Sequence, residues 1–463
     1  MRKKKILILI LITLIVLIIL IGALFYFLWP RGGTGKGSKL GQLKNQEYRI
    51  LYQKSRHAVN TQNMLGSECY SLNFVEFLDG SIVNRDGSNN KLLDLKNNPT
   101  SLITSKKYNN YFYISSPDNP ASEVYGYPFF NWSLPEQTLW SADFKNNQTK
   151  EIKTSTEDRF PGGVLASPEN RYLVYLMTTK KEKIVNPAEG FISDKINPFI
   201  SDSNLIIKGI KNGQEKTVLT DNYNRQLFES MGEFSDDGEA FYTIIREGAG
   251  FKLIKILLDS GKVKNFSEEF LNFDSSKIPW EELFPEKGDF AYASFSIDPN
   301  EERLIIYKNK FGNTMINTCI ADAKHKLWIF NLKGNSVEVF DNQEGYVSDL
   351  SWNKDGQGFA LAIMTASGCY PDYMDAKIDK MDKNGKNREN LVTEKKSKIT
   401  HIGWSPDGKE IAYDVYSTDM IGRIKKISVA DKTIKEIINT QTTEKTIDKQ
   451  KPVLLFFVDW VSN

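Results

Sequence analysis

The chain has few of the residues that build metal sites and nucleophilic catalytic centres. Its 463 residues include three histidines and three cysteines. His57, His325 and His401 have no other histidine, and no cysteine, at the spacing of metal ligands. We therefore expect no zinc site, no Ser-His-Asp triad and no cofactor, and we interpret the histidines as surface or strand residues.

Two short enzyme motifs are also incomplete. Gly35-Lys36 is followed by Gly37, where a phosphate-binding loop requires serine or threonine. The stretch GWSPD, residues 403–407, has Asp407 where the nucleophile elbow G-x-S-x-G requires its last glycine. No motif therefore identifies a reaction, and we expect the protein not to be an enzyme.

Basic residues are concentrated at the N-terminus. Residues 1–44 hold eight of the 60 Lys and Arg residues and no acid. The rest of the chain has 52 basic against 58 acidic residues, a net charge of −6. This mildly acidic balance argues against a nucleic acid as the partner.

The N-terminal segment predicts a membrane anchor. Ile6 to Trp29 contains no charged residue, and as a helix it would be about 36 Å long, enough to cross a hydrocarbon layer of about 30 Å. Basic residues 2–5 precede it, which predicts an N-terminus in the cytoplasm and the rest of the chain in the periplasm or at the cell surface. The alternative is a cleaved signal peptide, whose apolar core would be about 7–15 residues and would end in small residues.

Five stretches of the chain repeat one β-hairpin pattern. In each, a strand ends in an aromatic or apolar residue, a turn rich in Pro, Asp, Asn or Gly follows, and a second strand begins. Residues equivalent to Ser405 recur at intervals of 68, 63, 55 and 52 residues, which predicts a β-propeller. The stretches are Ala166–Tyr175, Phe234–Tyr242, Ile297–Tyr307, Trp352–Ala362 and Trp404–Tyr413.

A second set of hairpins gives the number of blades. Seven can be recognised as outer strand pairs, so we predict an all-β, seven-bladed propeller. The C-terminal strand, Pro452–Asn463, would join the N-terminal blade and close the ring, with Leu72–Phe77 as the next strand of that blade. Six blades, with Leu40–Leu95 as a separate stalk, is the alternative. The outer hairpins are Ser81–Leu95, Thr138–Ile152, Asn204–Leu219, Lys252–Phe266, Lys326–Phe340, Ala376–Val392 and Arg423–Ile438.

The hairpin WSPDGKEIAY, residues 404–413, and the outer hairpin that follows it resemble the repeat of TolB-type (PD40/WD40-like) propellers. The pattern is also similar to the propeller of prolyl oligopeptidase and dipeptidyl peptidase family proteins, here without their hydrolase domain. The resemblance implies a propeller with an extracytoplasmic binding role. We divide the chain into a cytoplasmic segment (1–5), a membrane anchor (6–29), a linker or stalk (30–70) and the propeller (71–463).

The long connections between predicted strands all lie on one side of the propeller, which makes that side the candidate binding surface. One connection holds an aromatic cluster suited to stacking on sugar rings or gripping a peptide, so the expected partner is an extracytoplasmic protein or glycan. Alternatively, the rings fold down and cap the centre of the propeller. The cluster consists of Tyr125, Tyr127, Phe129, Phe130 and Trp132.

Two of the three cysteines fall in connections of neighbouring blades. We expect Cys319 and Cys369 to form a disulfide outside the cytoplasm and Cys69 to remain free. A pair of free thiols is the alternative.

The sequence therefore favours a membrane-anchored binding or scaffold module. One alternative is a propeller enzyme of the glycoside hydrolase or lyase type, which needs several acids on the innermost strands. On those strands the sequence offers mainly Asp349 and Asp459. Another alternative is a regulator of a separate peptidase.

Overall fold

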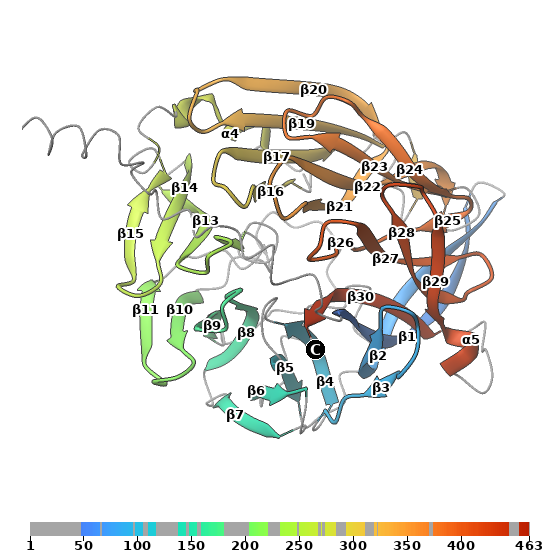
Figure 1. Ribbon diagram of the computed structural model, residues 1–463, viewed down its shortest axis with the longest axis horizontal. Coiled ribbons are helices and arrows are strands. Elements are labelled where there is room, and N and C mark those ends of the chain that lie inside the picture. Colours follow the sequence, from blue (N-terminus) through green and yellow to red (C-terminus); the bar gives the residue numbers. More distant parts are fainter. Residues whose placement is uncertain are drawn as a thin grey trace, which may run out of the picture. The chain divides into compact units, whose positions relative to one another are not determined.

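Antiparallel strands make up nearly all of the described chain, and they form seven sheets arranged in a ring (Figure 1). The predicted seven-bladed, all-β propeller is confirmed, and the six-bladed alternative is wrong. The computed structural model describes residues 48–64, 67–95, 98–104, 110–116, 138–144, 148–154, 159–179, 203–220, 232–247, 250–266, 270, 274–283, 293–310, 319–321, 323–369, 374–443 and 453–462.

Each blade is a sheet whose first strand lies innermost. Blades 1 to 3 consist of β4 (Asn98–Thr104), β5 (Asn110–Ser116), β6 (Thr138–Asp143) and β7 (Thr149–Thr154); β8 (Arg159–Ala166), β9 (Tyr172–Thr179), β10 (Ser203–Gly209) and β11 (Glu215–Leu219); and β12 (Gly232–Phe234), β13 (Ala240–Glu247), β14 (Gly250–Leu257) and β15 (Lys262–Asn265).

Blades 4 to 6 follow the same order, with short additional strands in two of them. They consist of β16 (Ala293–Ile297), β17 (Arg303–Lys310), β19 (Lys324–Asn331) and β20 (Val337–Glu344); β21 (Tyr346–Trp352), β22 (Gly358–Cys369), β23 (Met374–Asp382) and β24 (Glu389–Glu394), with β18 (Cys319–Ala321) also on β22; and β26 (Ile402–Trp404), β27 (Glu410–Ser417), β28 (Gly422–Ser428) and β29 (Ile434–Asn439), with β25 (Ser397–Lys398) also on β27. Helical turns occur at η3 (Ser275–Lys277), α4 (Trp280–Leu283) and α5 (Thr440–Thr443).

Blade 7 joins the two ends of the described chain. β30 (Val453–Ser462) is its innermost strand and pairs antiparallel with β1 (Tyr48–Met64), followed by β2 (Ser67–Asn84) and β3 (Lys91–Leu92). The predicted closure by the C-terminal strand is confirmed.

The second strand of blade 7 differs from the prediction. It is β1, which lies in the segment expected to be a linker, whereas Leu72–Phe77 belongs to the third strand, β2. The propeller therefore begins before residue 71. Ile50, Leu51 and Tyr52 are consecutive in β1 and fully buried, because neighbouring blades cover both faces of its sheet. β1 therefore lacks the alternation of buried and exposed residues that a half-exposed strand shows.

The repeated sequence pattern encodes one turn. In blade 6, Ser405 N donates to Glu410 O at 2.8 Å, and Ser405 Oγ accepts from Glu410 N at 2.9 Å. The equivalent residues in the other four turns, Ser167, Ser235, Asp298 and Asn353, make the same pair of bonds to the residue five positions later. The fourth residue of every turn has positive φ, which glycine adopts most readily, and these residues are Asn170, Gly238, Glu301, Gly356 and Gly408.

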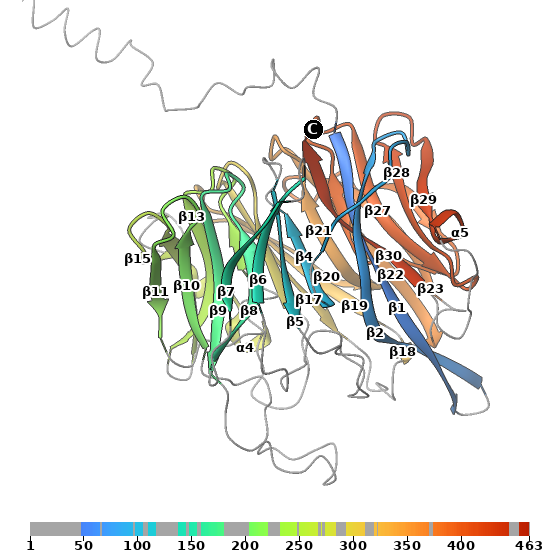
Figure 2. The same ribbon diagram turned by 90° about the horizontal axis from the view of Figure 1, so that it is seen from below.

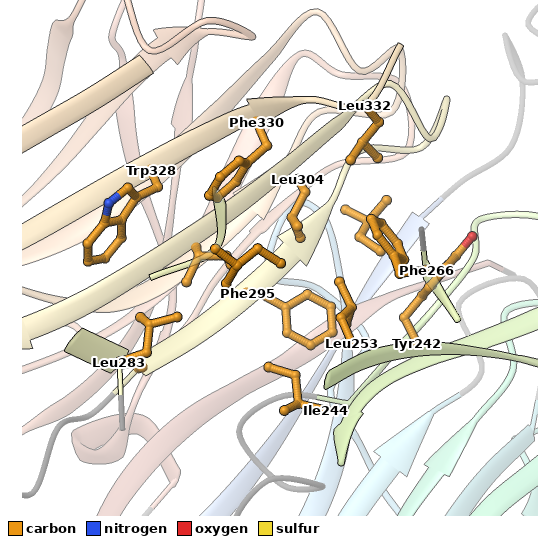
Figure 3. Packing of buried hydrophobic residues seen from close by; sticks show 14 of the residues in the cluster. Tyr242, Ile244, Leu253, Phe266, Leu283, Phe295, Leu304, Trp328, Phe330 and Leu332 are labelled. Atoms are coloured by element: carbon orange, nitrogen blue, oxygen red, sulfur yellow. The ribbon is translucent and has the colours of Figure 1, made fainter. Parts of the chain in front are cut away.

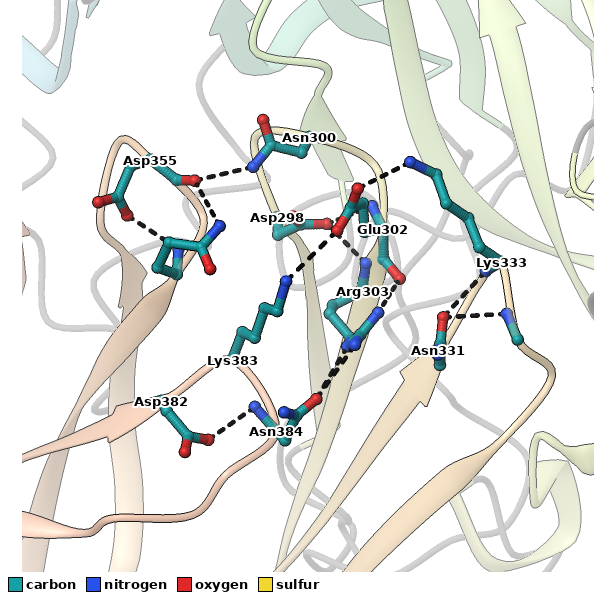
Figure 4. Close-up of polar contacts among 12 residues, drawn as sticks. Asp298, Asn300, Glu302, Arg303, Asn331, Lys333, Asp355, Asp382, Lys383 and Asn384 are labelled. Carbon is teal, nitrogen blue, oxygen red and sulfur yellow. Dashed lines mark hydrogen bonds and ion pairs between the residues drawn. The ribbon is translucent and has the colours of Figure 1, made fainter.

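Neighbouring turns also bind one another. Between blades 4 and 5, Asn300 Nδ2 donates to Asp355 O at 2.8 Å, and Arg303 donates to Asn384 Oδ1 at 3.1 Å (Figure 4). Glu302 pairs with Lys383 of the next blade at 3.6 Å. The end of the propeller that carries these turns, here called the turn end, is therefore fixed by contacts between blades.

Apolar side chains fill the space between blades. The cluster between blades 3 and 4 joins Tyr242, Ile244 and Leu253 to Phe295 and Leu304, with further residues from β19 and α4 (Figure 3). Hydrophobic burial between sheets is thus the main contribution to the stability of the ring.

The two ends of the sheets differ. The turn end also holds Tyr48, because Tyr48 pairs with Ser462 at the end of the innermost strand (Figure 2). The opposite end, here called the connection end, carries α4 and β18, and most of its long connections lie outside the described residues. No helix among the described residues is long and apolar enough to span a membrane, and residues 6–29 lie outside them.

Loss of the closing strand should destabilise the whole propeller. Removal of residues 452–463 exposes the edge of β1, so we expect aggregation or a clearly lower melting temperature. Gly422→Ala should produce a smaller loss, because the new Cβ would lie 2.5 Å from Leu455 N on β30. Thermal melting and size-exclusion chromatography test both changes, and a monomeric truncated chain with unchanged melting temperature would contradict the closure.

The buried carboxylate of Asp298 should lower the stability of the folded chain. It is 2% exposed, its Oδ2 has no hydrogen-bond partner, and burial raises its pKa. A raised carboxyl pKa costs stability above the pKa of the unfolded chain, so Asp298→Ser should raise stability at neutral pH by about 1–3 kcal/mol.

The gain from Asp298→Ser should disappear at low pH, where the carboxyl is protonated in both states. The matched control is Ser167→Asp at the equivalent buried position of blade 2, which should lower stability at neutral pH. Melting temperatures measured across pH provide the test, and equal stability of parent and Asp298→Ser at pH 7 would refute the expectation.

Candidate functional site

Three innermost strands come together around His401. The residue precedes β26 of blade 6, where the inner edge of the sheet is interrupted between β25 and β26. Asp349 reaches it from β21 of blade 5, and Phe456 from β30 of blade 7, with ring centroids of Phe456 and His401 6.1 Å apart. We call His401, Asp414, Asp349, Lys398 and Phe456 the His401 site.

The interrupted strand is stabilised by a buried carboxylate. Asp414 on β27 is fully buried, and its Oδ1 accepts hydrogen bonds from Thr400 N, Thr400 Oγ1 and His401 N at 2.7–3.0 Å. Its Oδ2 accepts from Phe457 N on the closing strand at 3.2 Å. The carboxylate thus replaces the missing ladder bonds and connects blade 6 to blade 7.

Asp414 also orients the imidazole of His401. Nδ1 lies 2.7 Å from Asp414 Oδ2, and because an ionised carboxylate only accepts, Nδ1 carries the proton. Burial lowers the pKa of His401, but Asp414 and Asp349 outweigh this and raise it above its usual value. The imidazole is 51% exposed, although its partner is fully buried.

Asp349 connects the site to blade 5. Its Oδ2 accepts from Ile402 N at 2.8 Å across the blade boundary, and its Oδ1 accepts from Leu350 N at 2.8 Å. Burial raises the pKa of Asp349 to about 6, a shift that these hydrogen bonds and the charge of His401 limit.

A cation and two aromatic rings complete the surroundings. Lys398 Nζ lies 5.9 Å from the centroid of the Tyr416 ring, and burial lowers the Lys398 pKa. The Tyr416 and Phe456 rings pack edge to face. The site therefore combines an oriented histidine, two acids and one amine within an aromatic wall.

In this arrangement the imidazole of His401, on the inner side of the ring, can accept or donate a proton. A histidine held by a buried carboxylate is the orienting half of a general-base device, and the same geometry can hydrogen-bond a ligand. Within the described part of the chain, no group of three His, Cys, Asp or Glu residues could hold a metal ion.

The other histidines and the second inner-strand acid have structural positions. His325 is 1% exposed, its Nδ1 lies 2.9 Å from Gly345 O, and burial lowers its pKa to about 4. His57 is in β1, with its side chain outside the described residues. Asp459 accepts from the adjacent Trp460 N at 2.8 Å.

The predicted binding cluster cannot be placed. Tyr125, Tyr127, Phe129, Phe130 and Trp132 all lie outside the described residues, so their role stays a prediction. The backbones of Cys319 and Cys369 are described, and they stand directly opposite each other in the β18–β22 pair.

The pairing of His401 with Asp414 was not foreseen from the sequence. The available signal was the strand EIAYDVYS, residues 410–417, in which Asp414 interrupts a run of apolar and aromatic residues. A buried charge requires hydrogen-bonding partners. His401 lies 13 residues before this acid, close to its place across the hairpin.

Comparison with known proteins supports the fold and nothing finer. No protein-family model and no curated protein matches the chain. Among solved structures, TolB from Acinetobacter baumannii is 11% identical with a TM-score of 0.39, and the match covers 87% of this chain and 82% of TolB. The seven sheets themselves confirm the propeller architecture expected from the repeats.

Two further solved structures are similar to this chain over most of its length. The propeller domain of the trilobed protease from Pyrococcus furiosus is 11% identical, with a TM-score of 0.43 and coverage of 73% of this chain and 84% of that one. Oligogalacturonate lyase from Vibrio parahaemolyticus is 10% identical, with a TM-score of 0.44 and coverage of 86% and 89%. At these levels the likeness carries no argument about activity.

The opposed cysteines should form a disulfide. Directly opposite residues of antiparallel strands have Cα atoms about 4.5–5.5 Å apart, within the range of roughly 4.4–6.8 Å that a disulfide spans. Non-reducing peptide mapping of protein from its native host should recover Cys319 and Cys369 in one linked peptide pair. Recovery of both as free thiols would contradict this prediction.

Removal of the Asp414 charge should lower the pKa of His401. The three histidines give separate imidazole signals in a nuclear magnetic resonance titration, and His401 should titrate above 6.5 while His325 stays neutral to about pH 4. In Asp414→Asn the His401 pKa should fall, because the attraction that stabilises the imidazolium is gone. An unchanged His401 pKa in this variant would disprove the pairing.

Proposed function

We propose that the protein is a membrane-anchored, extracytoplasmic propeller that binds a partner protein or small ligand at its connection end. The apolar segment of residues 6–29 would be the uncleaved anchor, with the N-terminus in the cytoplasm. No reaction is proposed.

The difference between the two ends of the propeller supports this role. The described chain begins at the turn end, where Tyr48 pairs with Ser462, and the turns there are short and bound to one another. His401 lies midway along the inner edge of blade 6, which runs from Ser397 to Trp404. The long connections predicted from the sequence lie at the other end, which makes the connection end the candidate surface for partners.

Topology mapping tests the anchor. Single cysteines placed at residue 3 and in the turn after Ser167 should differ in labelling of intact cells, with only the second reached by a membrane-impermeant maleimide. The parent chain with its own cysteines blocked is the control. Equal labelling of both positions, or release of the chain by carbonate washing, would overturn the proposed location.

Partner capture tests the binding role. Cross-linking on intact cells should recover a specific partner with the full-length chain, and replacement of Tyr127, Phe130 and Trp132 by Ala should abolish its recovery. Thermal melting of the same variant distinguishes loss of binding from loss of fold. A variant that melts normally and keeps every partner would exclude the aromatic cluster from the binding surface.

A further inference from the structure

We infer that the His401 site binds a carboxylate group, with the protonated imidazole of His401 donating a hydrogen bond from Nε2 to the ligand. This inference rests on the binding role proposed above and names the chemistry that would be recognised.

The orientation of the ring leaves one nitrogen available for a ligand. Nδ1 is committed to Asp414 Oδ2, whose carboxylate is fully buried. The side chain is 51% exposed, and none of the described residues hydrogen-bonds to Nε2. The ring cannot turn over without breaking the 2.7 Å bond to Asp414, so Nε2 is the nitrogen that remains for a ligand.

The charges around the imidazole favour an anionic ligand. Both oxygens of Asp414 and both oxygens of Asp349 accept hydrogen bonds from N–H groups of the protein, so both acids are already bound within the protein. They stabilise the imidazolium form of His401 without occupying its Nε2. Lys398 on β25 adds a second positive charge, and β30 contributes the uncharged ring of Phe456.

A carboxylate suits this site better than a phosphate. A charge-assisted N–H···O bond to a monoanion gains from the imidazolium and Lys398. A phosphate dianion would place a second negative charge near Asp349 and Asp414, and like charges at short range repel. The carboxylate could belong to an acidic sugar or to the end of a peptide chain, and the two sources share this chemistry.

Affinity should depend on pH and on the neighbouring charges. Binding should weaken as pH rises, because His401 loses its proton and Nε2 becomes an acceptor. His401→Gln should weaken binding about tenfold or more, the loss expected for one charge-assisted hydrogen bond. Asp349→Asn should move the pH dependence of binding to lower pH, because it removes a charge that stabilises the imidazolium.

The experiment is calorimetric titration of the purified full-length chain with two pairs of probes. Glucuronate is compared with glucose, and the dipeptide Ala-Ala with its C-terminal amide. We expect at least one carboxylate to bind and its uncharged analogue not to bind, which also identifies the source. His57→Gln is the matched control for His401→Gln, and melting temperatures establish that each variant is folded.

Three results would overturn the inference. They are binding of neither carboxylate, equal binding of charged and uncharged probes, and binding that neither His401→Gln nor a pH change affects. If His401→Gln does not fold, the pH profile of the parent and its shift to lower pH in Asp349→Asn decide the matter. Because the assay is independent of cellular location, a failed topology experiment and a failed titration are distinguishable.

Discussion

The hydrogen-bond ladder between β30 and β1 is the constraint on which the rest of the structure depends. Blades 1 to 6 each take their four main strands from one stretch of the chain, but blade 7 exists only when the C-terminal strand pairs with the N-terminal one. Trp460 of β30 is 1% exposed and donates from Nε1 to Gly403 O of blade 6 at 2.9 Å. The same strand supplies Phe456 and Phe457 N to the His401 site, so closure and site geometry are set together.

The features that the sequence predicted correctly are local ones. WSPDGKEIAY and the four equivalent stretches specify a turn through one hydrogen-bonding side chain and one left-handed residue. The turn can therefore be recognised within about ten residues of sequence. The repeated turns and outer hairpins therefore predicted seven blades. In contrast, β1 was missed because its buried residues are consecutive, a pattern that a strand covered on both faces shares with other buried segments.

The His401 site could not be predicted in the same way. Its chemistry depends on register across a hairpin, which brings Asp414 beside His401, and on contacts between blades, which bring Asp349 and Phe457 to the same place. Neither the register of a hairpin nor a contact between blades can be read from the spacing of residues in a single sequence. The reverse holds for the aromatic cluster of residues 125–132. The sequence singles it out, but the described residues do not include it.

β18 couples blade 4 to blade 5. This strand leaves the connection between β17 and β19 of blade 4 and adds to the sheet of blade 5 through β22. In a ring of independent repeats, each unit could open with its own free energy. Here the amide hydrogens of these two sheets should exchange with solvent as one cooperative unit, so that two of the seven blades open together or not at all.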